Sequence, residues 1–364
     1  MIVGVLGGGQ LARMLALAGR PLGLDFVFLS PDPESCAAPL GTHLCAGFDD
    51  ETALARLAEY AGIVTYEFEN APLDSVRYLA ERVPVVPSTQ ALAAAQDRLA
   101  EKSLFERLGI GTPAFVRIDD ARDLPAACRR TGFPAVLKTR RMGYDGKGQV
   151  IVGGEEDLGP AWARLGGKAS ILEAFVPYDR EVSLVAVRAR GGRTAFYPLS
   201  ENTHQDGILR LSVSRPDDPM EDQARARTVR LLDALDYIGV LALEFFQVGD
   251  QLLANEFAPR VHNSGHWTIE GAECSQFENH LRAIIGWPLG ATTRSGPAAM
   301  VNFIGTVPDA AEVLALPGVH LHHYGKSPRR GRKLGHATVR SDSQQQVEET
   351  ARALMRLAAA TTTD

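Results

Sequence analysis

The chain has few cysteines, no excess of positive charge and no long apolar run, and each absence excludes a class of protein. Its 364 residues include four cysteines without Cys-x-x-Cys spacing, so neither a disulfide framework nor a zinc site is predicted. A net charge of −6 argues against a general affinity for nucleic acid or anionic membranes. No apolar stretch approaches the roughly 20 residues that span a bilayer. The composition predicts a cytoplasmic, enzyme-sized protein without nucleic-acid or membrane partners.

Strand-like and helix-like patterns alternate over the first 90 residues. Short apolar runs at residues 2–6, 25–29 and 63–68 predict buried strands, and residues 10–18 carry apolar side chains at helical spacing. Strands that alternate with helices imply a parallel sheet covered by helices. The amino-terminal part is therefore predicted to be a parallel α/β domain.

The rest of the chain reads as mixed α and β structure. Residues 89–108 are rich in strong helix formers, which predicts one long helix. A chain of this length exceeds one ordinary core. We predict three segments, at residues 1–90, 91–290 and 291–364, with a smaller lobe at about 113–176 inside the second. The fold class is thus α/β combined with α+β.

A glycine turn follows the first predicted strand. Gly7-Gly8-Gly9-Gln10-Leu11-Ala12 fits the pattern GxGxxA, and Asp32 follows at the distance expected of a ribose-binding acid. This pattern is weak evidence for a dinucleotide, because any glycine turn before a helix offers N–H groups and a dipole to an anion. A dinucleotide site, another phosphate site and a purely structural turn all stay open.

A lysine and a glycine-rich loop suggest a second phosphate site. Lys138 ends an apolar strand, where a lysine is rare unless it meets an anion. Gly143-Tyr144-Asp145-Gly146-Lys147-Gly148 follows, and its glycines allow close approach to phosphate oxygens. The alternative is a hairpin connection with exposed charges. Beyond it, Glu173 lies in a strand and Glu181 follows a proline, positions suited to an adenine ring and a ribose diol or to ordinary surface acids.

Two glutamates are predicted to face each other across a hairpin. Apolar runs at residues 240–248 and 251–257 are joined by Gly249-Asp250, a turn signal. A turn centred near residue 250 places Glu244 opposite Glu256. Like charges at such a position repel unless a proton or a cation compensates them. Carboxylate oxygens at this spacing suit Mg²⁺, whereas a shared proton or an outward-facing pair is the alternative.

The loop after this hairpin concentrates polar residues. Arg260, His262 and Asn263 follow the second strand directly. Loops anchored on rigid strands commonly carry binding and catalytic groups. An arginine fork suits a planar anion such as bicarbonate.

The order of these features resembles the ATP-grasp superfamily. Within it, three segments are similar to the N5-carboxyaminoimidazole ribonucleotide synthetase family: residues 143–148, 204–210 and 255–267. The opening residues 6–11 and the late stretch 328–336 are also similar, so the resemblance covers nearly the whole chain.

The resemblance implies a fold, a reaction and partners. The fold would be an ATP-grasp domain with an N-terminal Rossmann-like parallel-sheet domain and a small C-terminal β-rich domain. The protein would be an ATP-dependent carbon–nitrogen ligase of de novo purine biosynthesis. It would join bicarbonate to 5-aminoimidazole ribonucleotide through carboxyphosphate, releasing ADP and phosphate. ATP, Mg²⁺ or Mn²⁺, and a homodimer are implied as well.

The resemblance also assigns roles to residues of this sequence. Nucleotide contacts are implied for Arg98, Lys138, Gly143, Tyr144, Asp145, Gly146, Lys147, Gly148, Gln149, Glu173, Ala174, Phe175, Val176, Glu181, His204, Asn255 and Glu256. Ribonucleotide contacts are implied for Gly8, Gly9, Gln10, Leu11, Glu67, Asp145, Arg332 and Lys333. The metal ligands would be Glu244 and Glu256. Catalytic roles, including bicarbonate binding, are implied for Arg260, His262, Asn263, Lys333 and Tyr144.

The sequence departs from the ATP-grasp pattern at one position, and three other functions remain open. Many ATP-grasp proteins carry Glu-x-Asn at the metal strand, whereas this chain has Glu256-Phe257-Ala258, which leaves Asn255 as a possible helper. A ligase that uses formate or glycine shares most of these features. A NAD-dependent oxidoreductase would explain only the first turn, and a nucleotide-binding regulator would lack turnover.

Overall fold

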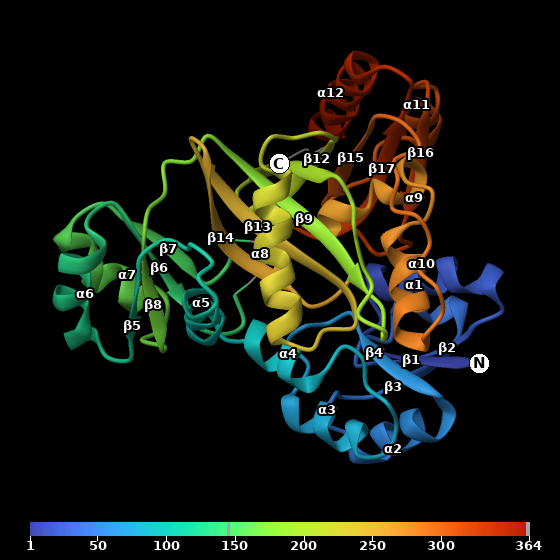
Figure 1. Ribbon diagram of the computed structural model, residues 1–364, viewed down its shortest axis with the longest axis horizontal. Helices are drawn as coiled ribbons and strands as arrows, with labels where there is room; N and C mark the ends of the chain where they lie inside the picture. Colours follow the sequence, from blue (N-terminus) through green and yellow to red (C-terminus); the bar gives the residue numbers. More distant parts are fainter. Residues whose placement is uncertain (144–145, 362–364) are drawn as a thin grey trace.

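Three β-sheets organise the part of the chain that the structure describes (Figure 1). The computed structural model describes residues 1–143 and 146–361. In the view of Figure 1, the N-terminal sheet lies at the lower right, and a small lobe, whose strands lie between Phe115 and Ala174, lies at the left. The largest sheet fills the centre and continues into the C-terminal segment at the upper right.

The N-terminal sheet is parallel, as predicted. Its strands lie in the order β3-β2-β1-β4. They are β1 (Ile2–Leu6), β2 (Asp25–Ser30), β3 (Thr42–Cys45) and β4 (Ile63–Tyr66). Its helices are α1 (Gln10–Gly19), α2 (Glu51–Tyr60) and α3 (Leu73–Ala80). The carboxyl ends of β1 and β4 face a cleft, which explains why the glycine turn after β1 reaches it.

The small lobe is a four-stranded antiparallel sheet in the order β5-β8-β6-β7. Its strands are β5 (Phe115–Ile118), β6 (Ala135–Thr139), β7 (Gln149–Val152) and β8 (Ser170–Ala174). Two helices, α6 (Leu124–Thr131) and α7 (Leu158–Arg164), cover one face and enclose a separate apolar core. The glycine-rich loop connects β6 to β7 and is thus carried by this lobe.

The central sheet has nine strands and passes from the second segment into the third. Its order is β14-β13-β9-β11-β12-β15-β17-β16, and β10 pairs with β9. Six strands of this sheet come from the second segment of the chain, namely β9 (Arg180–Arg188), β10 (Thr194–Phe196), β11 (Leu199–Gln205), β12 (Ile208–Arg215), β13 (Gly239–Val248) and β14 (Gln251–Ala258). The C-terminal strands are β15 (Ala298–Ile304), β16 (Val319–His323) and β17 (Lys333–Arg340). The C-terminal segment therefore shares a continuous sheet with the segment before it.

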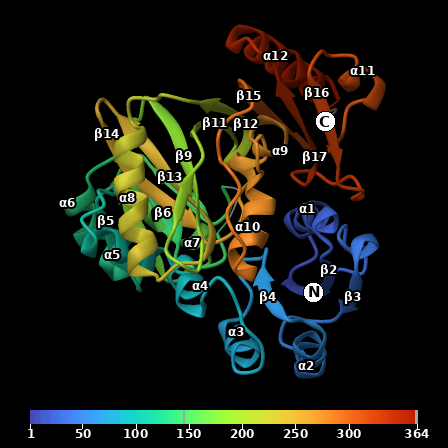
Figure 2. The ribbon, with the colours of Figure 1, turned by 45° about the vertical axis from the view of Figure 1, so that its right-hand side comes forward.

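Several helices pack against the central sheet. They are α8 (Glu221–Ala234), α9 (Thr268–Gly271), α10 (Gln276–Ile285), α11 (Ala310–Leu314) and α12 (Gln344–Thr361). Figure 2 shows α10 between the N-terminal sheet and the central sheet, with α1 nearby. One buried core runs from Phe26 and Leu15 through Leu281 to Val240, so the two sheets are packed through α10. Across the described residues, no helix is both long and apolar enough to cross a membrane.

The predicted long helix over residues 89–108 is wrong, because the segment forms two helices. They are α4 (Thr89–Ala95) and α5 (Arg98–Arg107). Asp97 separates them, since its carboxylate accepts hydrogen bonds from the Leu99 and Ala100 N–H groups and caps α5. The same carboxylate pairs with Arg140, 2.7 Å away, so a contact from the small lobe reinforces the break.

His280 of α10 links the N-terminal sheet to the central sheet. Its Nδ1 accepts a hydrogen bond from the Val240 N–H of β13 at 3.1 Å, and its Nε2 lies 2.9 Å from Thr65 Oγ1 of β4. Because Nδ1 accepts, the neutral ring carries its proton on Nε2. Complete burial lowers the pKa of His280 to about 3. The link therefore requires an uncharged imidazole.

We expect His280→Gln to reduce the acid sensitivity of the fold. An unfolded histidine titrates near about 6.5, so between that pH and about 3 only the unfolded state binds the proton. Stability is thus complete above that range and is lost as the pH falls. As the pH falls from about 7 to about 5, protonation of His280 in the unfolded state should lower the free energy of unfolding by about 2 kcal/mol. Urea unfolding at both pH values should show a smaller difference in the variant than in the unaltered protein. The exposed His320→Gln is the control, and an undiminished difference in His280→Gln would contradict the assignment.

Candidate functional site

A cleft with a volume of about 650 Å³ is bordered by residues from all three sheets. The turn after β1 and the end of β4 contribute one side, and the small lobe contributes another. Strands β9, β13 and β14, the loop after β14 and the start of β17 complete the wall. Segments far apart in the sequence therefore meet at one place, as expected of a site for several substrates.

Most of the predicted site residues lie on this wall. They are Gly9, Gln10, Leu11, Glu67, Arg98, Lys138, Gly143, Gly146, Gln149, Glu173, Ala174, Phe175, Val176, Glu181, His204, Glu244, Asn255, Glu256, Arg260, His262, Asn263 and Lys333. Four others lie off the wall: Gly8, Lys147, Gly148 and Arg332. Tyr144 and Asp145 lie outside the described residues.

The hairpin of β13 and β14 brings the two predicted metal glutamates to the cleft. Leu243 pairs with Phe257, which is the predicted register, but Phe245 pairs with Ala254. The register thus shifts by one residue at Glu244, which lies opposite both Asn255 and Glu256. A β-bulge of this kind re-aims side chains, and the four consecutive residues 255–258 of β14 all border the cleft.

Each of the two carboxylates is held by a cationic or imidazole partner. Glu256 Oε2 accepts a hydrogen bond from Arg98 Nη1 at 2.9 Å. Although burial raises the pKa of the Glu256 carboxyl, the Arg98 guanidinium lowers it to about 2. Glu244 Oε1 lies 2.9 Å from His262 Nε2. His262 Nδ1 accepts from the Ser264 N–H, so its proton is on Nε2, facing Glu244.

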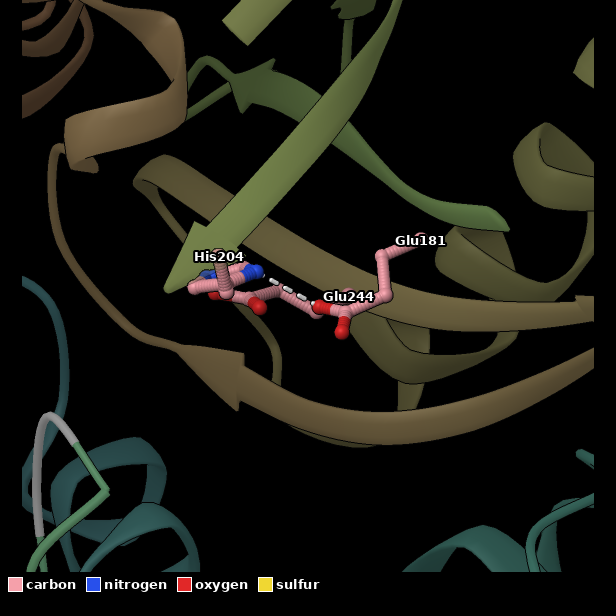
Figure 3. A group of neighbouring side chains, drawn as sticks. All are labelled: Glu181, His204 and Glu244. Atoms are coloured by element: carbon pink, nitrogen blue, oxygen red, sulfur yellow. Dashed lines mark ion pairs between the residues drawn. The ribbon is translucent and has the colours of Figure 1, made fainter. Parts of the chain in front are cut away.

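Glu244 also lies beside Glu181 and His204 (Figure 3). Ligand atoms of these three side chains all lie within 4.8 Å of one another, and they form the one such group found in the part of the chain that the structure describes. His204 Nδ1 lies 2.7 Å from Glu181 Oε2. Burial lowers the pKa of His204, but Glu181 and Glu244 outweigh this effect and raise it. The pairing favours an imidazolium beside two carboxylates.

Glu173 borders the cleft and is the counter-ion of two lysines. Its side chain is almost completely buried between the ammonium groups of Lys102 and Lys138. Burial raises the pKa of the Glu173 carboxyl, but the two lysines lower it to about 2. Burial also lowers the pKa of Lys102, and Glu173 opposes that shift. Glu173, Ala174, Phe175 and Val176 all border the cleft, and their contact with an adenine stays a prediction.

Sequence reasoning missed Glu101 and Lys102. With Arg98 they stand at positions i, i+3 and i+4 of α5, so one face of the helix carries all three. Glu101 Oε1 accepts from the Phe257 N–H at 2.7 Å, and burial raises the pKa of this carboxyl to about 8. The spacing of these residues places them on one face of a helix and could have drawn attention to them. Only the structure shows that this helix face is buried rather than exposed to solvent.

An apolar part of the wall suits a planar ring. Val136, Ile151, Phe175 and Phe246 border the cleft, and Phe175 and Ile151 are exposed despite being large and apolar. Phe246 stacks on Tyr178 with ring centroids 4.8 Å apart. Exposed apolar side chains in a concave site commonly pack against a ligand. The N–H groups of Ala174 and Phe175 are already bonded to the carbonyls of residues 114 and 134.

The loop after β14 carries polar atoms without partners. Arg260 Nη2 pairs with Glu69 at 2.7 Å and its Nη1 donates to the Val261 carbonyl. In residues 1–143 and 146–361, Arg260 Nε and both amide atoms of Asn263 are buried without a hydrogen-bond partner. Buried polar groups are rarely left unpaired. Donors and an acceptor without partners, next to a cation, are suited to a small oxygen-rich anion.

The far end of the cleft is built by the N-terminal and C-terminal segments. The Gly9 N–H donates to Glu67 Oε1 at 2.8 Å, which fixes the glycine turn against β4. Gln10 Oε1 accepts from the Lys326 ammonium, so the C-terminal segment reaches the same turn. Arg332 is not among the residues that border the cleft, and its Nη2 lies 3.5 Å from Asp32 Oδ2. Asp32, the expected ribose acid of a dinucleotide site, is thus engaged by an arginine.

Family models match three consecutive parts of the chain. Residues 1–96 match a ribonucleotide synthetase preATP-grasp domain, residues 103–277 match an ATP-grasp domain, and residues 298–350 match a phosphoribosylaminoimidazole carboxylase C-terminal domain. The predicted combination of an ATP-grasp fold with an N-terminal parallel-sheet domain and a C-terminal β-rich part is confirmed.

Characterised proteins are similar over almost the whole chain. The N5-carboxyaminoimidazole ribonucleotide synthase of Pseudomonas aeruginosa is 56% identical over 340 residues, which cover 93% of this chain and 94% of that protein. The crystal structure of N5-carboxyaminoimidazole ribonucleotide synthetase from Thermus thermophilus is 55% identical, with a TM-score of 0.94 and full coverage of both chains. An Aspergillus clavatus N5-carboxyaminoimidazole synthase, solved with ADP and 5-aminoimidazole ribonucleotide, is 29% identical with a TM-score of 0.91, covering 99% of this chain and 98% of that one.

We expect Gly8→Ala to destabilise the glycine turn. A Cβ at this position would lie 2.2 Å from Ser35 Oγ and 2.9 Å from the Ser30 Cβ. Overpacking of this kind costs roughly 1–3 kcal/mol, which should lower the thermal unfolding midpoint. Gly8→Ala combined with Ser35→Gly should recover part of the loss, because the nearest clash is removed. Gly62→Ala is the matched control, since its added Cβ comes no closer than 3.6 Å to Met1 Cγ. Equal midpoints for Gly8→Ala and Gly62→Ala would refute the close approach.

Proposed function

Since the chain belongs to the N5-carboxyaminoimidazole ribonucleotide synthase family of ATP-grasp ligases, an enzyme family of purine biosynthesis, we propose that this cleft carboxylates 5-aminoimidazole ribonucleotide with bicarbonate at the expense of ATP. The observation that carries the proposal is the meeting of three chemically different regions on one wall. A cationic region holds Lys138 and Arg98, an acidic hairpin holds Glu244 and Glu256, and the Arg260 loop holds unpaired polar atoms.

ATP is expected to bind between the small lobe and the central sheet. Its adenine would pack on the apolar wall that includes Phe175 and Phe246, and its ribose hydroxyls would meet Glu181 and His204. Lys138 and Arg98 would face the phosphates. The glycine-rich loop around Gly143 and Gly146 would close over them and exclude water.

The acidic hairpin fits a hard divalent cation such as Mg²⁺ or Mn²⁺. Glu244 and Glu256 offer carboxylate oxygens, and Asn255 Oδ1 is buried without a hydrogen-bond partner among the described residues. Oxygen donors of this kind, completed by phosphate and water, suit Mg²⁺. When bound, the cation would neutralise charge on the transferring phosphoryl group. Arg98 and His262 hold the two carboxylates in place for it.

Bicarbonate is expected to bind at the Arg260 loop. The Arg260 guanidinium is fixed by Glu69 on one side, which leaves its Nε for an anion. Asn263 offers both an N–H donor and a carbonyl acceptor, which matches an anion with several acceptor oxygens and one O–H. His262 borders the same space, between this loop and Glu244.

5-Aminoimidazole ribonucleotide is expected at the end of the cleft that the N- and C-terminal segments build. Gly9, Gln10 and Leu11 offer a backbone turn at a helix N-terminus, with Glu67 behind it. Lys333 at the start of β17 lies on the same wall and suits the phosphate. Arg332 and Gly8, which the family resemblance also assigns to this substrate, do not border the cleft. Two copies of the chain, working in the cytoplasm, are the assembly that the family resemblance implies.

The reaction would proceed in two displacements. A bicarbonate oxygen attacks the γ-phosphorus of ATP, the bond to the ADP oxygen breaks, and carboxyphosphate forms. The substrate amine then attacks the carbonyl carbon of carboxyphosphate, or of CO₂ released from it, phosphate leaves, and the nitrogen loses one proton. Lys138 and Arg98 stabilise the charge that develops during the first displacement. Arg260 and Asn263 hold the carboxyl group beside the amine, where orientation supplies much of the rate.

We expect Glu256→Gln to abolish ATP turnover, because an amide binds a hard cation far more weakly than a carboxylate does. The affinity for Mn²⁺, measured by electron paramagnetic resonance without substrates, should fall by at least about tenfold. Glu59→Gln, on the exposed face of α2, is the control. Turnover close to that of the unaltered protein at saturating Mg²⁺ would rule out the metal role of Glu256.

We expect Arg260→Lys to raise the KM for bicarbonate by roughly 10- to 100-fold while leaving the KM for ATP nearly unchanged. A lysine carries its three donors on a single nitrogen, so it cannot reproduce the separate positions of Nη2, which pairs with Glu69, and Nε, which is left for an anion. The exposed Arg129→Lys is the control. If bicarbonate dependence stays the same in Arg260→Lys, bicarbonate binds elsewhere.

A further inference from the structure

Three buried charged groups lie where the small lobe joins the central sheet. Glu173 of β8 accepts from Lys138 of β6 on one carboxylate oxygen, and Lys102 of α5 lies 2.9 Å from the other. We call Lys102, Glu173 and Lys138 the buried triad. All three side chains are at least nine-tenths buried, so bulk water screens them little.

Lys102 connects parts of the chain that are far apart in sequence. Besides Glu173, its ammonium donates to Thr112 Oγ1 at 3.0 Å and to the Ala254 carbonyl at 3.3 Å. Thr112 precedes the small lobe, and Ala254 directly precedes the bulge of β14. A completely buried lysine is rare and costly unless it is paired. Lys102 therefore has one partner in β8 of the small lobe, one in the segment that precedes the small lobe, and one in β14 of the central sheet.

The charges of the triad do not cancel. Two ammonium groups and one carboxylate give a net charge of +1. Of the two lysines, only Lys138 borders the cleft. The neighbouring Glu101 acts electrostatically on Lys102, but its Oε1 accepts from the Phe257 N–H, and burial raises the pKa of this carboxyl to about 8. At neutral pH Glu101 is therefore mostly protonated and adds little negative charge to the triad. The uncompensated positive charge is thus directed into the cleft through Lys138.

We propose that Lys102 is a positioning residue that acts on the nucleotide phosphates through Glu173 and Lys138. By sharing the Glu173 carboxylate, Lys102 keeps Lys138 from being neutralised, so that a bound polyphosphate supplies the missing negative charge. Without Lys102, Glu173 and Lys138 form a neutral pair and the cleft loses one unit of positive charge. This inference rests on the proposed function only in that the ligand carries nucleotide phosphates.

The test is a charge-balance cycle on the full chain, with ADP and adenosine as probes in titration calorimetry. Lys102→Met should weaken ADP binding by about tenfold, the effect of one nearby charge in a partly screened site. Adenosine binding should stay within about twofold, because adenosine carries no phosphate. Lys102→Met combined with Glu173→Gln restores the net charge to +1, and its ADP affinity should recover toward that of the unaltered protein.

Two further variants separate charge from packing. Thr112→Val removes the hydroxyl that accepts from Lys102 and donates to the Ala254 carbonyl, but it changes no charge, so its ADP affinity should match the unaltered protein. Glu173→Gln alone should bind ADP at least as tightly as the unaltered protein. This variant keeps the test decisive if Lys102→Met does not fold.

Several outcomes would overturn the inference. They are unchanged ADP affinity in Lys102→Met, an equal loss of adenosine affinity in that variant, a double variant weaker than Lys102→Met, and a Glu173→Gln variant that binds ADP several-fold more weakly. Failure of the proposed function looks different, since it would leave ADP binding and this cycle intact while the carboxylation substrates fail to stimulate ATP turnover.

Discussion

The incomplete compensation of buried charge is the constraint on which the rest of the cleft depends. Glu173 is shared by two lysines, so one positive charge is left to face the cleft. Three further carboxylates, those of Glu181, Glu244 and Glu256, lie on the wall and each has one cationic or imidazole partner. Groups of like charge persist this close together only when counter-charges hold them, and burial makes the pairings of Glu181 and Glu244 more sensitive to the loss of a partner than that of the more exposed Glu256.

This arrangement gives the cleft two ends and a middle. The small lobe and β13 form the end suited to a nucleotide, and the turn after β1 and the start of β17 form the end suited to a second, phosphorylated substrate. The Arg260 loop lies between them, fixed to the N-terminal segment through Glu69. An unstable carboxyl intermediate formed in the middle would therefore have a short path to its acceptor. The packing of α10 joins the N-terminal sheet to the central sheet, whereas the small lobe has a sheet and an apolar core of its own.

Much of the fold and the composition of the wall could be predicted from local sequence signals. Alternating apolar runs predicted the parallel N-terminal sheet, and Gly249-Asp250 predicted the hairpin and its register beside Phe257.

The bulge at Glu244 was not predicted, because a turn signal says nothing about packing farther along the strands. The break at Asp97 was missed because helix propensity outweighed a cap whose partner, Arg140, lies 43 residues away. Lys102 was missed because its burial comes from contacts with Thr112 and Ala254, which no local pattern contains. The substrates were inferred from the resemblance of residues 255–267 to the N5-carboxyaminoimidazole ribonucleotide synthetase family, not from the hydrophobic pattern or the spacing of residues. The domain boundaries and the roles of individual site residues stay predictions.

The central claim is that this cleft transfers a carboxyl group from bicarbonate to a nucleotide amine when ATP is cleaved. The most direct measurement incubates the protein with ATP, Mg²⁺, ¹³C-bicarbonate and 5-aminoimidazole ribonucleotide, and follows ADP release together with the ¹³C spectrum of the nucleotide. The account predicts ADP release that requires the ribonucleotide and bicarbonate together, and one labelled carbon on the amine for each ADP formed. ADP release that is indifferent to bicarbonate, or a nucleotide without label, would contradict it.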